Sequence, residues 1–133
     1  YDTFVRLDME SSAYTEKTLR FFEDRLYPNY PKNVGIVLQS YLRRTEADVR
    51  RANEIKCRVR ICKGAYQEPA SVAYPEKADV DANYIKCMKL LMSEGNYPGI
   101  ATHDERIIQE AVRYAKEANI APDRFEFQML YGV

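Results

Sequence analysis

The sequence contains no tryptophan, one histidine and only three cysteines among its 133 residues. A structural zinc site needs four cysteine or histidine ligands, usually in closely spaced pairs, and this sequence has no Cys-x-x-Cys pair. Cys57 and Cys62 fall in one predicted strand, where they would lie about 16 Å apart, whereas a disulfide needs α-carbons within about 7 Å. The composition therefore argues against a zinc site or a disulfide framework, and it favours a reducing compartment.

The sequence also lacks a net charge and long apolar runs. Twenty basic residues balance twenty acidic ones, so nothing favours nucleic acid or an anionic membrane as a partner. No apolar run approaches the ~20 residues needed to span a bilayer. No signal peptide is visible, and the sequence starts at Tyr1 rather than at Met, so we expect the natural N-terminus to be absent. At 46% hydrophobic and 30% charged residues, the composition is typical of one globular domain.

Strand and helix patterns alternate along the chain. Apolar, β-branched runs predict strands at about 3–8, 34–39, 57–62, 97–102 and 125–130. Apolar residues at helical spacing predict four helices between them. We place Thr15 and Thr45 as the N-caps of the first two helices, the latter in a capping box with Asp48. The third helix is expected at 79–94 with Gly95 as its cap, and the fourth opens at His103.

This alternation predicts parallel βαβ units. Two α/β architectures fit, a doubly wound open sheet and a (β/α)8 barrel. Polar residues at alternate strand positions favour the barrel, and no Gly-x-Gly-x-x-Gly follows the first strand. These polar residues are Arg6, Asp8, Arg60, Glu126 and Gln128. Five strands make five-eighths of a barrel, so we expect residues 1–133 to be a single domain from a longer protein, and Glu126 to pair with an arginine inside it.

Arg60 stands in the middle of the third predicted strand. An unpaired buried guanidinium costs several kcal/mol, so Arg60 is either paired, on a solvated edge, or functional. Lys63 then lies at the carboxyl end of this strand, and Gly64 allows a tight turn there. Because active sites of such barrels lie at the carboxyl ends of the strands, this strand predicts part of a site.

Polar residues follow the other strands at the same positions. They are Asp8, Gln39, Thr102, His103 and Asp104, together with the end of the last strand, residues 128–131, where Gln128 and Tyr131 are the polar members. Each has a plain structural alternative: Asp8 could cap a loop, Gln39 could bond a backbone group, His103 could flank a helix start, and Tyr66 could simply pack. The convergence of all of them at one rim is what predicts a site.

The residues leave two chemistries open. Lys63 could form a Schiff base, as in barrel aldolases, if burial lowers its pKa. Alternatively, Arg60 and Lys63 could hold an anionic cofactor while Gln39 and Gln128 bond a planar heterocycle.

Five motifs resemble the proline dehydrogenase family in their order and approximate spacing. They are Val5-Arg6-Leu7-Asp8-Met9-Glu10, Val37-Leu38-Gln39-Ser40-Tyr41, Val59-Arg60-Ile61-Cys62-Lys63-Gly64-Ala65-Tyr66, Ala101-Thr102-His103-Asp104 and Phe125-Glu126-Phe127-Gln128-Met129-Leu130-Tyr131-Gly132. The resemblance covers essentially the whole chain. It implies a distorted (β/α)8 barrel that binds FAD non-covalently, oxidises L-proline to Δ1-pyrroline-5-carboxylate and passes electrons to a membrane quinone.

The resemblance also implies a role for individual residues. Arg60 would lie beside the flavin N5, where a cation favours the reduced ring. Gln39 and Gln128 would contact the ring or its ribityl chain. The phosphate and adenosine portions would be lined by Lys63, Gly64, Ala65, Thr102 and His103. Asp8, Tyr66 and Leu130 would lie on the substrate side. In this interpretation Lys63 is no Schiff base.

The family's paired arginines, which bind the substrate carboxylate, and a further substrate lysine are not among these residues. An inactive fragment that self-associates through open sheet edges is therefore an alternative, as is a related enzyme acting on hydroxyproline or on a proline derivative of an antibiotic pathway. The resemblance implies a cytoplasmic location with peripheral membrane contact, at the mitochondrial inner membrane in a eukaryote.

Overall fold

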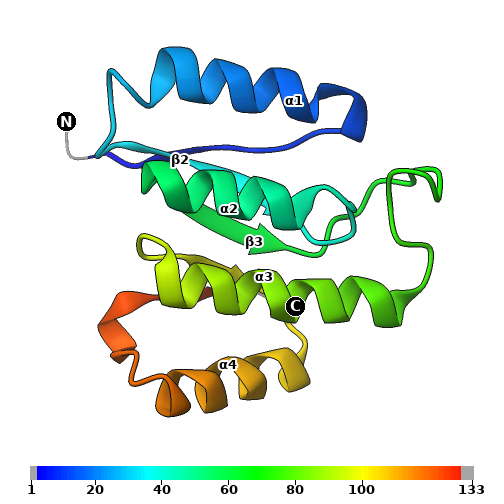
Figure 1. Cartoon of the computed structure of the whole chain (residues 1–133), viewed down its shortest axis with the longest axis vertical. Coiled ribbons are helices and arrows are strands. Elements are labelled where there is room, and N and C mark those ends of the chain that lie inside the picture. Colours follow the sequence, from blue (N-terminus) through cyan, green and yellow to red (C-terminus); the bar gives the residue numbers. More distant parts are fainter. Residues whose placement is uncertain (1–2, 130–133) are drawn as a thin grey trace.

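The computed structural model describes residues 3–129. Five strands alternate with four α-helices (Figure 1). The strands are β1 (Val5–Leu7), β2 (Val34–Gln39), β3 (Arg58–Cys62), β4 (Gly99–Ala101) and β5 (Glu126–Gln128). The α-helices are α1 (Ser12–Phe21), α2 (Thr45–Ile55), α3 (Lys77–Glu94) and α4 (Glu105–Glu117). A π-helical segment, η1 (Phe22–Leu26), extends α1, and a 3₁₀ turn, η2 (Pro122–Arg124), precedes β5.

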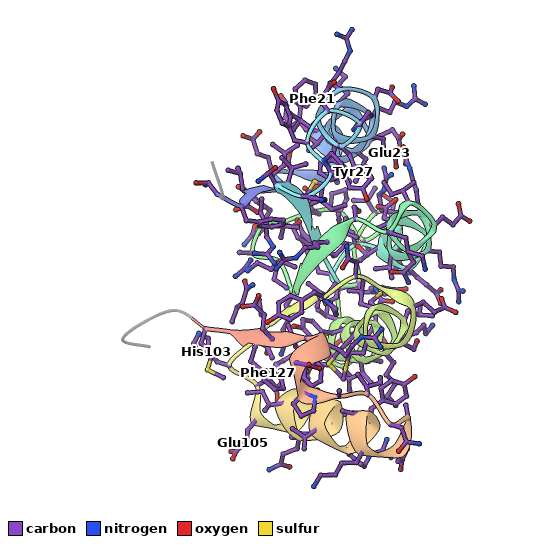
Figure 2. The ribbon with its side chains drawn as sticks, turned by 90° about the vertical axis from the view of Figure 1, so that its left-hand side faces the viewer. Phe21, Glu23, Tyr27, His103, Glu105 and Phe127 are labelled. Carbon is purple, nitrogen blue, oxygen red and sulfur yellow. The ribbon has the colours of Figure 1, made fainter. Side chains whose placement is uncertain are left out.

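All five strands are parallel, and each pairs with its sequence neighbours in the order β1-β2-β3-β4-β5. The helices follow one another along one side of this sheet, as Figures 1 and 2 show. A doubly wound sheet would carry helices on both sides, so this arrangement confirms the α/β expectation of a partial (β/α)8 barrel. No helix in the described part is long and apolar enough to cross a membrane.

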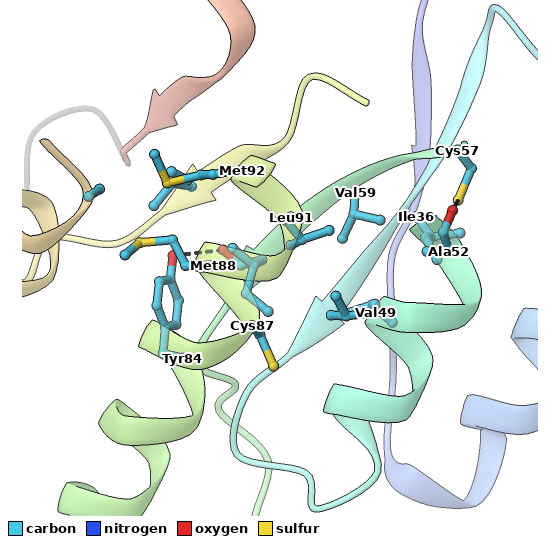
Figure 3. Close-up of a cluster of buried hydrophobic side chains, with 14 of the residues drawn as sticks. Ile36, Val49, Ala52, Cys57, Val59, Tyr84, Cys87, Met88, Leu91 and Met92 are labelled. Atoms are coloured by element: carbon cyan, nitrogen blue, oxygen red, sulfur yellow. Dashed lines mark hydrogen bonds between the residues drawn. The ribbon is translucent and has the colours of Figure 1, made fainter. Parts of the chain in front are cut away.

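The main core lies between the sheet and helices α1 to α4. In β3, Val59 and Ile61 are fully buried beneath the helices, whereas Arg58, Arg60 and Cys62 alternate with them on the other, half-buried face. This period of two follows from the pleat of a strand. Residues from α2 and α3 complete the core (Figure 3).

The helix starts differ from those expected. Thr15 lies inside α1, which begins at Ser12, and Thr45 is the first residue of α2 rather than its cap. The Thr45 hydroxyl donates instead to the carbonyl of Gln39, and Asp48 pairs with Arg44 at 2.7 Å. The predicted capping box is therefore wrong, because the Thr45 hydroxyl bonds the end of the preceding strand and the Asp48 carboxylate pairs with Arg44, four residues earlier.

The other boundaries are closer to expectation. Strand 34–39 is confirmed, whereas the remaining strands are shorter than predicted. Helix α3 starts two residues early at Lys77 and ends at Gly95, whose backbone is extended. Helix α4 is capped by Asp104, whose carboxylate accepts from the Arg106 amide at 3.0 Å.

Charged side chains occupy the sheet face opposite the helices. The Glu126 carboxylate lies 3.7 Å from the Arg58 guanidinium, which confirms its expected pairing with a strand arginine. Arg6 also lies near this pair, and burial, together with the positive charges of Arg58 and Arg60, lowers the pKa of Arg6. This face is thus polar and predominantly basic.

Candidate active site

A cavity of about 580 Å³ lies at the carboxyl ends of β1 to β4. It is lined by Asp8, Met9, Gln39, Arg60, Cys62, Lys63, Gly64, Ala65, Tyr66, Ala101, Thr102, His103 and Asp104. The parallel order explains this convergence, since every strand ends at the same rim. The sequence analysis assigned a role to nine of these lining residues, and the structure brings all nine together.

Arg60 reaches the cavity from the polar face of β3. Its Nε donates to the Gln128 side-chain oxygen at 2.8 Å, which joins β3 to β5 across β4. Gly99 in β4 makes this contact possible, because a Cβ there would lie 2.5 Å from the Gln128 amide nitrogen. Among the described residues, no carboxylate lies within ion-pairing distance of Arg60, so its charge is available to a ligand.

Gln39 ends β2 at the floor of the cavity. Its side chain is buried, and its side-chain oxygen has no hydrogen-bond partner within residues 3–129. A buried acceptor without a partner costs roughly 1–3 kcal/mol, so this oxygen suits a ligand that presents an N–H or O–H donor.

The backbone turns sharply at Gly64, directly after Lys63. Its φ of +104° is a conformation that other residues rarely adopt, and a Cβ there would lie 2.4 Å from the Tyr41 ring. The missing side chain therefore lets the chain pass close over Tyr41 and leaves the cavity wall open. Burial, with the nearby Glu68 and Tyr66, raises the pKa of Tyr41 to about 12, so this phenol stays neutral.

Lys63 lies between two carboxylates. Its ammonium is 2.9 Å from Asp81 of α3 and 3.0 Å from Asp104, the N-cap of α4. Although burial alone lowers the pKa of Lys63, these two hydrogen bonds raise it overall. The hydrogen bond from Lys63 in turn lowers the pKa of Asp104. A Schiff-base lysine needs a lowered pKa, so this geometry argues against the aldolase alternative.

The remaining predicted residues lie around the mouth. Asp8 is exposed, and its carboxylate accepts from the Met9 amide at 2.8 Å. Tyr66 is 50% exposed. Thr102 is buried and its hydroxyl accepts from the Asp104 amide at 3.0 Å. His103 lies at the surface beyond β4 (Figure 2).

Some site residues were missed or lie outside the described part. Leu130 falls outside residues 3–129. Met9, Cys62, Ala101 and Asp104 line the cavity without having been assigned a role. Cys62 lies on the same face of β3 as Arg60, and the alternation of residues along this strand could have predicted its place in the cavity. Asp81 gives no such signal, since it lies within a helix, and only the fold brings it to Lys63.

The donor set fits part of a flavin. A buried acceptor at Gln39, the guanidinium of Arg60 and the close backbone at Gly64 would suit a planar ring with N–H donors that takes up negative charge. The cavity volume lies within the range of cofactor sites.

Comparison with known proteins identifies the family of this chain. The sequence model of the proline dehydrogenase family matches residues 1–133. Proline dehydrogenase of Deinococcus radiodurans is 45% identical over 133 residues, which cover all of this chain and 43% of that protein. Proline dehydrogenase 2 of Bacillus subtilis is 45% identical over 129 residues, covering 97% of this chain and 42% of that protein. The chain thus spans less than half the length of these relatives.

Solved structures give the same result. The crystal structure of proline utilization A from Bdellovibrio bacteriovorus, inactivated by N-propargylglycine, superposes with a TM-score of 0.89 at 34% identity, over 98% of this chain and 16% of that one. The Bradyrhizobium japonicum protein of the same name superposes with a TM-score of 0.87 at 24% identity, over 99% of this chain and 15% of that one, and supports the fold alone. The chain belongs to the proline dehydrogenase family.

Proposed function

We propose that these residues form part of an FAD-dependent enzyme that oxidises L-proline to Δ1-pyrroline-5-carboxylate and passes the electrons to a membrane quinone. The observation that carries the proposal is the cavity at the strand ends, which gathers Arg60, Gln39 and Lys63 in a chain of the proline dehydrogenase family. The cytoplasmic location with peripheral membrane contact belongs to the same proposal.

Each of these cavity residues would have a separate role in the reaction. Bound FAD would accept the hydride that leaves the proline carbon next to the ring nitrogen. Arg60, which Gln128 orients, would supply a positive charge beside the ring position that gains electron density. The buried Gln39 oxygen, which has no partner among the described residues, would accept a hydrogen bond from the ring and fix its orientation. No strong nucleophile is required, which agrees with the ion-paired state of Lys63.

The two ends of the cavity would serve different parts of the ligands. Gly64, Ala65, Thr102 and His103 would provide small or polar walls for the phosphate and adenosine portions, with Lys63 as an oriented cation. Asp8 and Tyr66 are both exposed lining residues and lie on the substrate side in this proposal, where L-proline would enter. Leu130 remains assigned to the substrate side by resemblance alone.

The test uses the full-length protein. We expect purified protein to show the absorption of oxidised flavin and to reduce a dye in the presence of L-proline, faster than with hydroxyproline. Protein without flavin, or without proline-dependent dye reduction, would contradict the proposal.

Arg60→Met tests the central residue, because methionine keeps much of the packing of the stem and removes the charge. The flavin reduction potential should fall and proline oxidation should slow about 10-fold or more, as for loss of one electrostatic donor. Arg58→Met is the matched control, since Arg58 lies on the same face of β3 but outside the cavity. An unchanged potential in Arg60→Met would refute the role of this residue.

A further inference from the structure

The loop between β3 and α3, residues 63–76, forms one wall of the cavity. Its second half is fastened to the turn after β2. The Tyr74 amide donates to the Tyr41 carbonyl at 2.8 Å, and the Arg43 amide donates to the Val72 carbonyl at 3.0 Å. The Arg43 side chain also donates to the Ala70 carbonyl at 2.8 Å. Residues 70–74 are therefore held independently of the cavity.

The first half of the loop is held differently. In the described part of the chain, no backbone–backbone hydrogen bond joins residues 64–68 to another element. The Glu68 carboxylate makes the connection instead. One of its oxygens accepts from the Ser12 amide and the other from the Ser12 hydroxyl, both at 2.8 Å. Hydrogen bonds to a charged group are roughly twice as strong as neutral ones.

Helix α1 lacks a cap of its own. Its N-cap residue, Ser11, makes no side-chain hydrogen bond to the helix, and the first turn contains no acidic residue. A carboxylate at this end satisfies a free N–H group and interacts favourably with the helix dipole. Glu68, 56 residues away in sequence, provides that carboxylate.

This contact joins two opposite walls of the cavity. Ser12 follows Asp8 and Met9, which line the cavity from the β1 side, and Glu68 follows Tyr66, which lines it from the β3 side. We propose that Glu68 is a positioning residue that caps α1 from the neighbouring loop and thereby fixes Tyr66 opposite Asp8 at the mouth. The proposal rests on the function proposed above insofar as this mouth admits the substrate.

Hydrogen–deuterium exchange of the full-length protein tests the contact without substrate. In Glu68→Ala, amide exchange at residues 12–14 and 65–68 should accelerate about 10-fold or more, the factor that corresponds to loss of a charge-assisted hydrogen bond. Residues 70–74 should keep their protection, because Arg43 and Tyr41 hold them. Glu76→Ala is the matched control, since Glu76 lies in the same loop and makes no capping bond to α3.

Two further variants separate the contributions. Ser12→Ala removes the hydroxyl bond but keeps the amide, so it should give a smaller change in exchange than Glu68→Ala. Glu68→Ala should then accelerate amide exchange less in the Ser12→Ala background than in the wild-type protein, since the two residues share one contact. Additive effects, or unchanged exchange at residues 12–14 and 65–68, would refute the proposal.

Kinetics provide the second readout. A loosened mouth lowers the fraction of enzyme that is ready to bind, so Glu68→Ala should raise KM for L-proline about 10-fold while kcat changes less than about 2-fold. An equal fall in kcat with unchanged KM would contradict a positioning role. A full-length protein that shows the exchange changes but never oxidises proline would refute the proposed function and leave the capping contact intact.

Discussion

Arg60 and Lys63 carry the same charge and lie three positions apart in sequence, yet their surroundings are opposite. Arg60 is bonded to the neutral amide of Gln128, whereas Lys63 is held between the carboxylates of Asp81 and Asp104. A lysine whose charge is balanced by two carboxylates can still bind and orient a ligand, but it adds little net positive potential to the cavity. The free charge that the proposed reaction requires therefore belongs to Arg60.

The state of Lys63 gives a prediction for amine labelling. Because its pKa is raised, Lys63 has less free amine at neutral pH than an ordinary lysine. We expect acetic anhydride to label Lys63 more slowly than the exposed Lys17, measured peptide by peptide by mass spectrometry. Asp81→Asn should accelerate labelling at Lys63 and leave Lys17 unchanged.

Borohydride reduction in the presence of pyruvate adds a direct test of the aldolase alternative. We expect no adduct at Lys63, because a protonated amine does not attack a carbonyl. A stoichiometric adduct at this residue would restore the Schiff-base interpretation.

Most cavity residues were predictable because a simple rule places them. Gln39, Lys63 and Thr102 each end or follow a strand, and parallel strands end at one rim. Asp81 and Glu68 could not be found in this way. Asp81 lies in a helix and Glu68 in an irregular loop, and each contacts a residue that is distant in sequence. Such pairs follow from the packing of elements, not from local patterns.

At the scale of elements, an ion-pair network joins α1 to α2. Glu16 of α1 lies 2.6 Å from Arg44 and 3.3 Å from Arg51, and within α1 it pairs with Arg20 at 2.9 Å. The hydrogen bond from Arg44, followed by that from Arg20, lowers the pKa of Glu16 to about 2. The folded state thus favours the charged form of this carboxylate.

This shift predicts an acid-side loss of stability. A carboxylate with a lowered folded pKa stabilises the fold fully above its ordinary value of 4.5, and this contribution is lost as the pH falls toward about 2. Because Glu16 and its arginine partners are partly exposed, Glu16→Gln should reduce the free energy of unfolding by only about 1 kcal/mol at pH 7. The difference from wild type should shrink between pH 4.5 and pH 2 in urea titrations.

Glu54→Gln is the matched control, since Glu54 is an exposed residue of α2. It should change stability little at any pH. A Glu16→Gln variant that is as stable as wild type at pH 7 would show that the network contributes nothing measurable.

Tyr84 connects a helix to the strand ends at the cavity. Its ring is fully buried in the core (Figure 3). Its hydroxyl lies 3.0 Å from the carbonyls of both Ile61 and Ala101, near the ends of β3 and β4. Burial raises the pKa of Tyr84, so the hydroxyl keeps its proton and remains a donor.

Tyr84→Phe removes this donor without changing the packing of the ring. We expect it to lower the free energy of unfolding by about 1–3 kcal/mol, the cost of leaving a buried acceptor without its partner. Thermal denaturation measures the change. Tyr14→Phe on the exposed side of α1 is the control, and equal midpoints for the two variants would contradict this role of the Tyr84 hydroxyl.

The helices were predicted less well than the strands, for a physical reason. Apolar periodicity located α4, in which Ile107 is buried but Val112 is 40% exposed. Thr15 and Thr45 were expected as caps because they precede apolar residues, yet the actual N-cap of α1 is Ser11, whose side chain makes no cap bond. When a cap comes from another element, as Glu68 does here, the local sequence gives no signal for the helix start.

At the scale of the whole molecule, the described sheet has two open edges. β1 pairs only with β2, and β5 only with β4, among residues 3–129. A hollow accompanies each edge, and the one beside β5 is mostly apolar. One of about 490 Å³ beside β5 is lined by Val112, Ala115, Ile120, Phe125 and Phe127, among others, and one of about 330 Å³ beside β1 includes Leu7 and Phe21. Unpaired strand edges and apolar patches both favour association with other chains.

A polypeptide limited to these 133 residues should therefore self-associate and fail to oxidise L-proline. The resemblance implies that the arginines that bind the substrate carboxylate are not among its residues, and two missing charge-assisted bonds of roughly 1.5–3 kcal/mol each would weaken binding by orders of magnitude. Light scattering and a dye-reduction assay measure the two outcomes.

Val112→Lys, which places a charge in the hollow beside β5, should lower the mean mass, whereas Gln109→Lys on the exposed part of the same helix should not. A monodisperse monomer that reduces the dye with proline would contradict both expectations. Such a protein would be stable without closure of the sheet and active without the arginines that bind the substrate carboxylate.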